Sequence, residues 1–395
     1  MLRFVSAGES HGQALIAWIS GFPAGLPVDL DLVQRELHRR QLGYGRGGRQ
    51  RIEKDRADVL AGVRHGKTIG APIAIRIENR DWPNWEKALP VEDTEGADAP
   101  YSAEDQRPLT APRPGHADLA GALKFNFHDA RYVLERASAR ETASRVAAGA
   151  FAKLLLREFG GEVLSHTIAV GHARLNRDAT WDEIVELSHN LESPFRCVDP
   201  NTEKNMKAEV DDALRAGDSV GGIFEVVAHG IPPGLGSHAQ WDEKLDARIA
   251  RAVMSIQAVK AVEIGTGVAN ASSYGSEVQD EIRYDPGRKR FERSSNRAGG
   301  LEGGITNGQP IVVRGYLKPI STLRRALLTA DLKTKEAVKA AYERSDVCVV
   351  PAGGVAGEAM LALELASAFL EKCGGDSLEE TRRNFLGYQK QLDEF

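Results

Sequence analysis

The sequence of 395 residues is poor in several features that would define a protein class. It has three cysteines, at positions 197, 348 and 373, whose wide spacing gives neither a disulfide framework nor a metal-ligand pattern, so we expect a reducing compartment, the cytoplasm. A formal net charge of −5 excludes a generally basic nucleic-acid binder, so any anion site must come from local basic clusters. We expect no signal peptide, because polar residues follow the start directly. We also expect no membrane span, because no run approaches about 18 apolar residues.

Glycine, in contrast, is frequent, with 40 residues in the chain. Many of these glycines fall in two pairs of segments that repeat their Gly and Pro positions. Residues 7–26 match residues 216–235 at a constant offset of 209, and residues 62–73 match residues 300–311 at a constant offset of 238. The pattern predicts one domain, residues 1–395, with an internal duplication whose copies span approximately 7–78 and 216–317.

Each copy predicts a strand, a Gly-Pro turn, an amphipathic helix, a Gly-rich loop and a second strand. The strands are expected at residues 12–19 and 71–78 in the first copy, and at 222–229 and 310–317 in the second. One helix is expected after Asp29. Another is expected after Trp241, with an apolar face formed by Leu245, Ile249, Val253 and Ile256. Residues 86–112 are typical of an exposed loop, and residues 355–373 of a buried helix.

Two short motifs resemble phosphate-binding loops but lack the required context. Residues 43–48 satisfy G-x-G-x-x-G, yet they follow a basic helix instead of a strand, so they do not predict a dinucleotide fold. Residues 62–68 resemble a P-loop, but position 61 is alanine where the first glycine should stand, and a strand is expected to follow instead of a helix. Neither motif is assigned a function.

Basic residues concentrate between positions 35 and 56. The cluster consists of Arg35, Arg39, Arg40, Arg46, Arg49, Arg51, Lys54 and Arg56. A solvated helix face with a loop would account for much of it. However, Arg46 and Arg49 lie within a glycine loop, whose backbone can wrap around an anion. In an acidic protein, the cluster therefore favours an anion site.

A turn at residues 113–118, with the sequence Arg-Pro-Gly-His-Ala-Asp, presents a histidine beside an arginine. A lone histidine in a turn is usually only exposed. Because proline and glycine fix this turn, Arg113 and His116 should be presented together. The arrangement favours His116 as a proton donor beside an anion.

A second motif, at residues 136–141, combines a helix start with basic side chains. Ser138 and Glu141 predict a capping box that opens a helix ending near Gly160. Arg136 and Arg140 flank the expected helix N-terminus, where free N–H groups and the helix dipole favour phosphate. A good N-cap would explain the serine alone, but the two arginines favour a phosphate nearby.

Asp346 and His11 complete the candidate residues. Asp346 lies close to Arg344 and enters an apolar run, so an ion pair and partial burial can tune its proton affinity. In the repeat, His11 matches Val220 and His65 matches Gly303. Since one copy of the scaffold does without each histidine, a structural role is less expected, and this comparison favours a catalytic role for His11.

With these motifs the sequence resembles the chorismate synthase family. The resemblance runs over nearly the whole chain and includes several long motifs in the same order, at residues 8–12, 43–47, 113–118, 136–142, 257–258, 296–304, 318–322 and 344–346. Ser345 departs from the pattern, because many relatives have histidine there. The resemblance implies an α+β fold with a pseudo-symmetric, duplicated β-α-β sandwich core, and a homotetramer.

The resemblance also implies a reaction, the 1,4-anti elimination of phosphate from 5-enolpyruvylshikimate 3-phosphate to give chorismate. This reaction requires reduced FMN but has no net redox change. NADPH can supply the reducing equivalents, either to the protein itself or through a separate flavin reductase. Reduced flavin would supply electron density, while the protein would position it and manage protons.

By the same resemblance, the catalytic acids and bases fall on His11, His116 and Asp346. We expect His11 to protonate the leaving phosphate, His116 to stabilise the reduced flavin, and Asp346 to relay a proton. Positions that contact substrate phosphate or NADPH fall on Arg40 and Arg46. Flavin contacts fall on Arg136, Ala137, Ser138, Gln257, Ala258, Gly303, Lys318, Pro319, Ile320, Ser321, Thr322 and Arg344.

Two other functional classes stay open at this point. A flavin- or NADPH-dependent oxidoreductase would use the same basic and cofactor-binding features, but it would consume reductant in every turnover. An RNA-binding protein would use the basic cluster at residues 35–56. It would also need aromatic residues among the basic ones, and only Tyr44 is present there.

Overall fold

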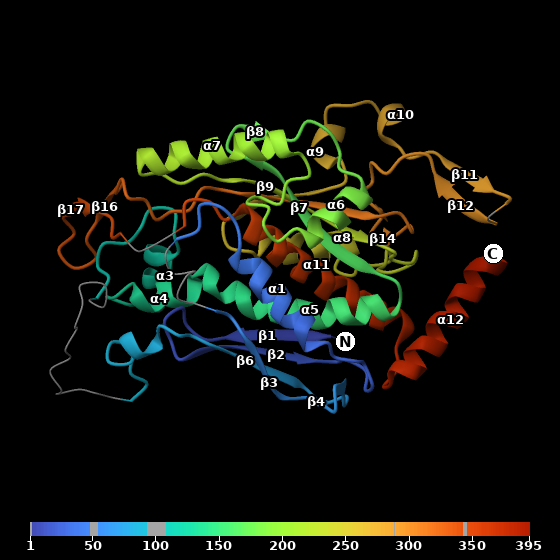
Figure 1. Ribbon diagram of the computed structural model, residues 1–395, viewed down its shortest axis with the longest axis horizontal. Coiled ribbons are helices and arrows are strands. Elements are labelled where there is room, and N and C mark those ends of the chain that lie inside the picture. Colours follow the sequence, from blue (N-terminus) through green and yellow to red (C-terminus); the bar gives the residue numbers. More distant parts are fainter. Residues whose placement is uncertain (1, 48–53, 93–107, 288, 343–345) are drawn as a thin grey trace.

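The computed structural model describes residues 2–47, 54–92, 108–287, 289–342 and 346–395. Its helices and strands form an α+β structure, as predicted. Two antiparallel sheets lie on either side of a layer of long helices (Figure 1). The apolar faces of the sheets and helices together form one extended core.

The first sheet has the strand order β1-β2-β6-β3. The four strands are β1 (Arg3–Ala7), β2 (Ala14–Ser20), β6 (Ile73–Glu78) and β3 (Ala57–Ala61). Alternate side chains of β2 and β6 are buried, as expected for a sheet with only one face on the core. The predicted strands at 12–19 and 71–78 are therefore present, and each begins two residues later than expected.

The second sheet has the order β10-β15-β9-β7-β8. Its strands are β10 (Val259–Ile264), β15 (Ile311–Leu317), β9 (Gly222–His229), β7 (Glu162–Val170) and β8 (Ala173–Arg174). β9 coincides with its prediction, and β15 begins one residue later than predicted. The central strands β7 and β9 are buried almost throughout, because helices or loops cover both of their faces.

Four helices fill the space between the sheets or border it: α1 (Leu30–Gln41), α5 (Thr142–Glu158), α8 (Leu245–Met254) and α11 (Val350–Cys373). Asp29 caps α1 as predicted, since its carboxylate accepts from the backbone N–H groups of Asp31 and Leu32. α5 and α11 pack against each other at Gly149, where a Cβ would lie 2.4 Å from the Ala359 Cα. Glycine therefore permits this close contact between the helices.

Helix α11 is buried, as predicted for residues 355–373. Glu358 and Glu364 interrupt its apolar residues, so it contains no run of about 18 apolar residues, as expected, but by length and composition alone it could cross a membrane. However, 89% of its most apolar window is buried inside the protein. Burial against α5, β7 and β9 explains why the helix is apolar on nearly all sides.

The remaining elements form connections and the periphery. They are β4 (Val63–Arg64), β5 (Lys67–Thr68), η1 (Trp82–Asn84), α3 (Asp118–Phe125), α4 (Arg131–Ala137), η3 (Ala139–Glu141), α6 (Trp181–His189), α7 (Pro200–Ala216), α9 (Gly267–Asn270), α10 (Gly275–Val278), β11 (Ile282–Asp285), β12 (Arg290–Arg293), β13 (Leu301–Glu302), β14 (Ile305–Thr306), β16 (Leu328–Ala330), β17 (Ala337–Lys339) and α12 (Leu378–Glu394). The β11–β12 hairpin and α12 project from one end of the molecule (Figure 1).

The two sheets share one connectivity. The order β1-β2-β6-β3 corresponds to β7-β9-β15-β10, and the small hairpin β4–β5 corresponds to β13–β14. Thr68 Oγ1 donates to the Pro23 carbonyl at 2.6 Å, and Thr306 Oγ1 donates to the Pro232 carbonyl at 2.7 Å. These matched bonds support the duplicated core. The single-domain duplication with copies at 7–78 and 216–317 stays a prediction.

One local prediction was wrong. Ser138 does not open the long helix, and no capping box forms with Glu141. Ser138 ends α4 and caps only the single turn η3, where its Oγ accepts from the Arg140 N–H at 3.3 Å, and α5 begins at Thr142. The Glu141 carboxylate instead accepts from Ser6, from Arg145 and from Gln257. Ser6 and Gln257 are distant in the sequence and Arg145 lies one helical turn further along; together they outcompete the bond to Ser138.

Candidate active site

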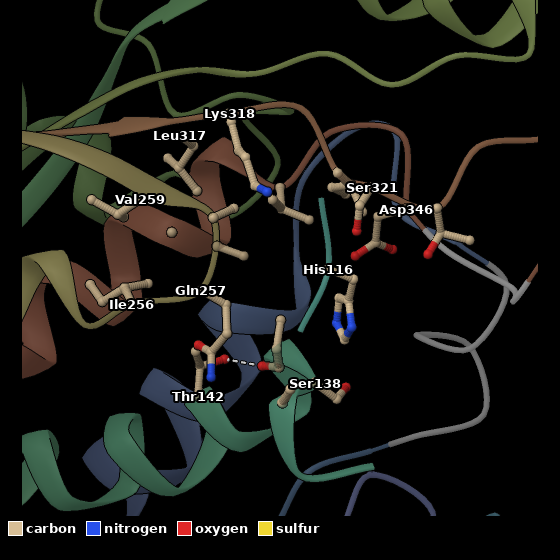
Figure 2. Close-up of a pocket in the computed structure, with 18 of the residues that line it drawn as sticks. His116, Ser138, Thr142, Ile256, Gln257, Val259, Leu317, Lys318, Ser321 and Asp346 are labelled. Carbon is tan, nitrogen blue, oxygen red and sulfur yellow. Dashed lines mark hydrogen bonds between the residues drawn. The ribbon is translucent and has the colours of Figure 1, made fainter. Parts of the chain in front are cut away.

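A cavity of about 450 Å³ opens where the N-termini of α5 and α11 meet the loop before β10 and the segment after β15 (Figure 2). Most of the candidate residues line it, although they come from distant parts of the chain. They are Arg40, Arg46, His116, Ala137, Ser138, Gln257, Ala258, Lys318, Pro319, Ile320, Ser321, Thr322 and Asp346. The size is typical of a small-molecule site.

Three predicted site residues do not line this cavity. Arg136 is exposed and donates to the Ser6 carbonyl and hydroxyl, both at 2.9 Å. Gly303 lies in the β13–β14 turn, where nothing is within 4 Å of an added Cβ. His11 does not line it either, although its neighbour Ser10 donates to the hydroxyl of Ser138, a lining residue, at 3.0 Å. Arg344 lies outside the described residues.

The two ends of the cavity differ in character (Figure 2). Apolar Ile256, Val259 and Leu317 gather at one end, whereas His116, Ser321 and Asp346 lie at the other. An apolar wall beside a polar, charged region suits a ligand with a flat ring and anionic groups. The arrangement therefore fits a flavin together with a phosphorylated substrate.

Two of the segments expected to contact flavin, residues 257–258 and 318–322, are joined directly to each other. The Lys318 backbone N–H donates to the Ala258 carbonyl at 2.9 Å, which joins segment 318–322 to the Gln257-Ala258 pair. Ala258 has a φ of +70°, an unusual backbone conformation for a residue with a Cβ. The Lys318 ammonium also donates to the Gly115 carbonyl, so the same segment holds the turn that carries His116.

Positive charge dominates the cavity. Arg40, Arg46, Arg113 and Arg140 all line it, and so do the first residues of α5 and α11. The N-terminal ends of helices carry partial positive charge and free N–H groups. Guanidinium groups add planar, charged donors that suit phosphate and carboxylate. The site is therefore built to attract anions in a protein whose net charge is negative.

Asp55 holds two of these arginines in place. Its carboxylate accepts from Arg40 at 2.8 Å and also from Arg140, and its side chain is fully buried. Burial alone would raise the pKa of Asp55, but the charges of Arg40 and Arg140 outweigh it and lower the pKa. Arg40 also donates to the Thr142 hydroxyl at 3.2 Å, at the start of α5. Asp55 thus positions both guanidinium groups before any anion arrives.

Arg46 pairs with Asp346 at 2.9 Å, and the Gly47 N–H donates to the same carboxylate at 2.5 Å. Burial lowers the pKa of Arg46, although the charge of Asp346 opposes the shift. The Nε atoms of Arg40 and Arg46 are buried and have no hydrogen-bond partner among the described residues. Such donors are costly to leave unused, and a bound anion would satisfy them.

One further arginine of the basic cluster has a different role from the one expected. Arg39 is buried and points into the core, where it pairs with Glu36 at 2.6 Å and with Glu358 at 2.8 Å. Lys153 joins the same two carboxylates. Arg39 therefore belongs neither to an anion site nor to a solvated helix face. Arg49 and Arg51 lie outside the described residues.

His116 is oriented by a buried carboxylate. Its Nδ1 lies 2.5 Å from Asp118 Oδ1, and the Asp118 side chain is fully buried. Arg113 donates to Asp118 through Nε at 2.8 Å and through its backbone N–H at 3.0 Å. Burial would raise the pKa of Asp118, but the hydrogen bonds from His116 and Arg113 hold it well below its ordinary value. With Nδ1 engaged, Nε2 is the nitrogen left for ligands.

His11 is also held by a buried carboxylate at its Nδ1. Its Nδ1 lies 2.9 Å from Glu135 Oε1, and its backbone N–H donates to Glu135 Oε2 at 2.7 Å. The imidazole stacks on the Trp85 ring, with 4.0 Å between the centroids. Two histidines, 105 positions apart, are therefore both fixed at Nδ1 by an acidic side chain.

The sequence analysis did not identify these supporting residues. Asp118 was visible in the 113–118 motif but had no assigned role, and its spacing of two from His116 was the available signal. Asp55, Glu135 and Trp85 gave no local signal, because their partners are distant in the sequence: 124 positions separate His11 from Glu135.

Comparisons with known proteins show the family of the chain. The model of the chorismate synthase family matches residues 2–370. The sequence is 62% identical to the chorismate synthase of Solibacter usitatus (strain Ellin6076) and 60% identical to that of Koribacter versatilis (strain Ellin345), each over 100% of both chains. A crystal structure of chorismate synthase, 41% identical, has a TM-score of 0.78 to this structure and covers 100% of this chain and 99% of its own.

Proposed function

Because the chain belongs to the chorismate synthase family, we propose that the basic cavity is its active site. The chain catalyses the 1,4-anti elimination of phosphate from 5-enolpyruvylshikimate 3-phosphate, which gives chorismate without net redox change. It is a carbon–oxygen lyase of the shikimate pathway, which leads to the aromatic amino acids. The observation that carries the proposal is the convergence of four arginines and two helix N-termini on one cavity.

The substrate explains the charge of the cavity. It brings one phosphate and two carboxylates, and Arg40 and Arg46 each keep a buried Nε that an anion would satisfy. In our proposal these two arginines bind either the substrate phosphate or the phosphate of NADPH. Asp55 supports both uses, because it fixes Arg40 and Arg140 without neutralising the whole site.

Reduced FMN is the cofactor that the cavity fits. Its ring would lie against the apolar end, while Ala137, Ser138, Gln257, Ala258 and residues 318–322 would hold it. When bound, reduced flavin supplies electron density for cleavage of the carbon–oxygen bond. NADPH would serve as the source of reducing equivalents, used by the chain itself or by a separate reductase.

The proton-handling roles follow from how each side chain is held. His11 donates a proton to the leaving phosphate, His116 provides positive charge at the polar end of the cavity, and Asp346 moves the proton released in the elimination. His116 and Asp346 line the cavity directly. His11 does not line it, but its neighbour Ser10 bonds Ser138 of the cavity lining, so its role requires the bound substrate to reach this side of the site.

We also propose a cytoplasmic homotetramer. Gly303 and Arg136 do not line the cavity of their own chain. If either residue contacts flavin, it contacts the flavin that is bound to a neighbouring chain of the tetramer. Light scattering would test the tetramer, and a flavin titration should give one site per chain.

The central test is an anaerobic assay with reduced FMN and substrate. We expect phosphate and chorismate to form in equal amounts while the reduced flavin is regenerated in every turnover. Consumption of one reductant per product would instead support the oxidoreductase alternative. A salt-titrated RNA-binding assay that shows a tight complex would revive the nucleic-acid alternative.

A further inference from the structure

We propose that Glu135, which no motif singled out, is the positioning residue of His11 and fixes the orientation of its imidazole for turnover. The proposal rests on the proposed role of His11 as the acid that protonates the leaving phosphate. In that step the substrate C–O bond breaks, the His11 Nε2–H proton moves to the phosphate oxygen, and solvent later reprotonates the imidazole. Glu135 does not touch substrate; it acts through His11.

The contact geometry supports a positioning role. One carboxylate binds His11 at two points, the ring Nδ1 at 2.9 Å and the backbone N–H at 2.7 Å. The Glu135 side chain is 1% exposed, so solvent screens the contact very little. No described residue bonds Nε2 of His11, and this nitrogen therefore carries the transferable proton. The stack on Trp85 prevents the ring from rotating away from the carboxylate.

The repeat shows that the scaffold does not require this carboxylate. Val220 occupies the position of His11 in the second copy, and its backbone N–H donates to the Val347 carbonyl at 3.0 Å. A backbone acceptor is sufficient there. In the first copy a buried carboxylate replaces it and binds the histidine ring as well. Compared with Val220, His11 therefore gains a second interaction, between its ring and a charged carboxylate.

The other charged groups near His11 also support a positioning role for Glu135. Arg131, on α4, lies 3.9 Å from the Glu135 carboxylate, and its guanidinium lies 5.3 Å from the Trp85 ring centroid. Asp81 accepts from the Trp85 indole N–H at 3.1 Å, and Glu9 lies two positions before His11. Among the described residues, Glu135 is therefore the acidic side chain that bonds the His11 ring directly.

The test compares Glu135→Gln with wild type in anaerobic turnover across pH. We expect kcat to fall about 10- to 100-fold in the variant at every pH, because an imidazole that is not held in place donates its proton less effectively. KM should change less than threefold. Glu135→Asp, which keeps the carboxylate on a shorter side chain, should restore part of the lost kcat.

Glu225→Gln is the matched control. Glu225 is a buried carboxylate that bonds another buried histidine, His166, at 2.9 Å, but neither residue lines the cavity. It should lower the melting temperature without lowering kcat. Wild-type kcat in Glu135→Gln, together with low activity in His11→Ala, would overturn the role of Glu135. Full activity in His11→Ala would overturn the role of His11 itself.

Discussion

Replacing Asp118 with asparagine should separate the orientation of His116 from its presence. Asp118 accepts hydrogen bonds from the Arg113 backbone, the Arg113 guanidinium and His116 Nδ1, all at 2.5 to 3.1 Å. The asparagine side chain has the same size and keeps one acceptor oxygen. However, its own N–H groups would face N–H groups that now donate to Asp118. Neutralising one partner of a buried ion pair costs about 3–5 kcal/mol, and we expect the lower end because volume is conserved.

The loss of activity should be larger than the loss of stability suggests. Without the carboxylate, His116 has no fixed tautomer, and we expect kcat to fall about 10²- to 10⁴-fold in the anaerobic phosphate-release assay. Asp58→Asn is the control, because Asp58 forms only a surface pair with Arg76 and should change stability by less than about 0.5 kcal/mol. Near-wild-type turnover in Asp118→Asn, alongside an inactive His116→Ala, would refute the reasoning.

Asp118→Asn should also change how the stability of the fold depends on pH. The pKa of Asp118 in the folded protein lies below its ordinary value of 3.8. A depressed pKa means that the ionised carboxylate stabilises the fold above that ordinary value and that this contribution disappears as the pH falls through the folded-state pKa. The difference in melting temperature between wild type and Asp118→Asn should therefore be full at pH 7 and shrink below about pH 4. A difference that does not change with pH would contradict it.

Three further predictions concern other parts of the site and the scaffold. His11→Ala and His116→Ala should each keep the fold, as judged by circular dichroism, but lower turnover about 10²- to 10⁴-fold; near-wild-type turnover would reject that residue's role. Arg46→Ala should weaken binding of the phosphorylated ligand about 10- to 100-fold, measured as KM, and an unchanged KM would remove Arg46 from the anion site. Gly62→Ala and Gly300→Ala should each destabilise the fold by about 1–3 kcal/mol in denaturant titrations, because both glycines have positive φ and an added Cβ would meet a proline carbonyl at 2.5 and 2.6 Å. Very different costs would argue against equivalent turns.

The parts of the fold that could be predicted are those governed by local periodicity. Alternating or continuous apolar runs located four strands to within two residues, and the Asp29 cap located the start of α1. The Ser138 capping box failed for a physical reason. Glu141 finds two tertiary partners that the sequence does not show, Ser6 and Gln257, besides the local partner Arg145, and an exchange of hydrogen bonds with Ser138 cannot compete with them.

The candidate site could be predicted only as far as the motifs reach. Residues 318–322, Gln257 and His116 were identified because they lie in recognisable segments, and the structure brings them to one cavity. Asp55 and Glu135 could not be identified, because a buried carboxylate is recognisable only from the partners that compensate its burial. Those partners are brought together by the packing of α1, α4 and α5, and sequence spacing carries no record of that packing.

The two differences between the repeated copies do not carry equal weight once their surroundings are known. His65 and Gly303 both occupy hairpin turns with positive φ, of 49° and 60°, so the backbone alone favours glycine and the histidine is merely tolerated. That difference needs no functional cause. At His11 and Val220, in contrast, the backbone donor is satisfied in both copies, but by a buried carboxylate in one and by a carbonyl in the other. Burying a charge is expensive without a compensating partner, and Val220 shows that an uncharged acceptor is sufficient for the turn. Function is therefore the stronger explanation for the His11 pair, and the argument from duplication applies to His11 much more than to Gly303.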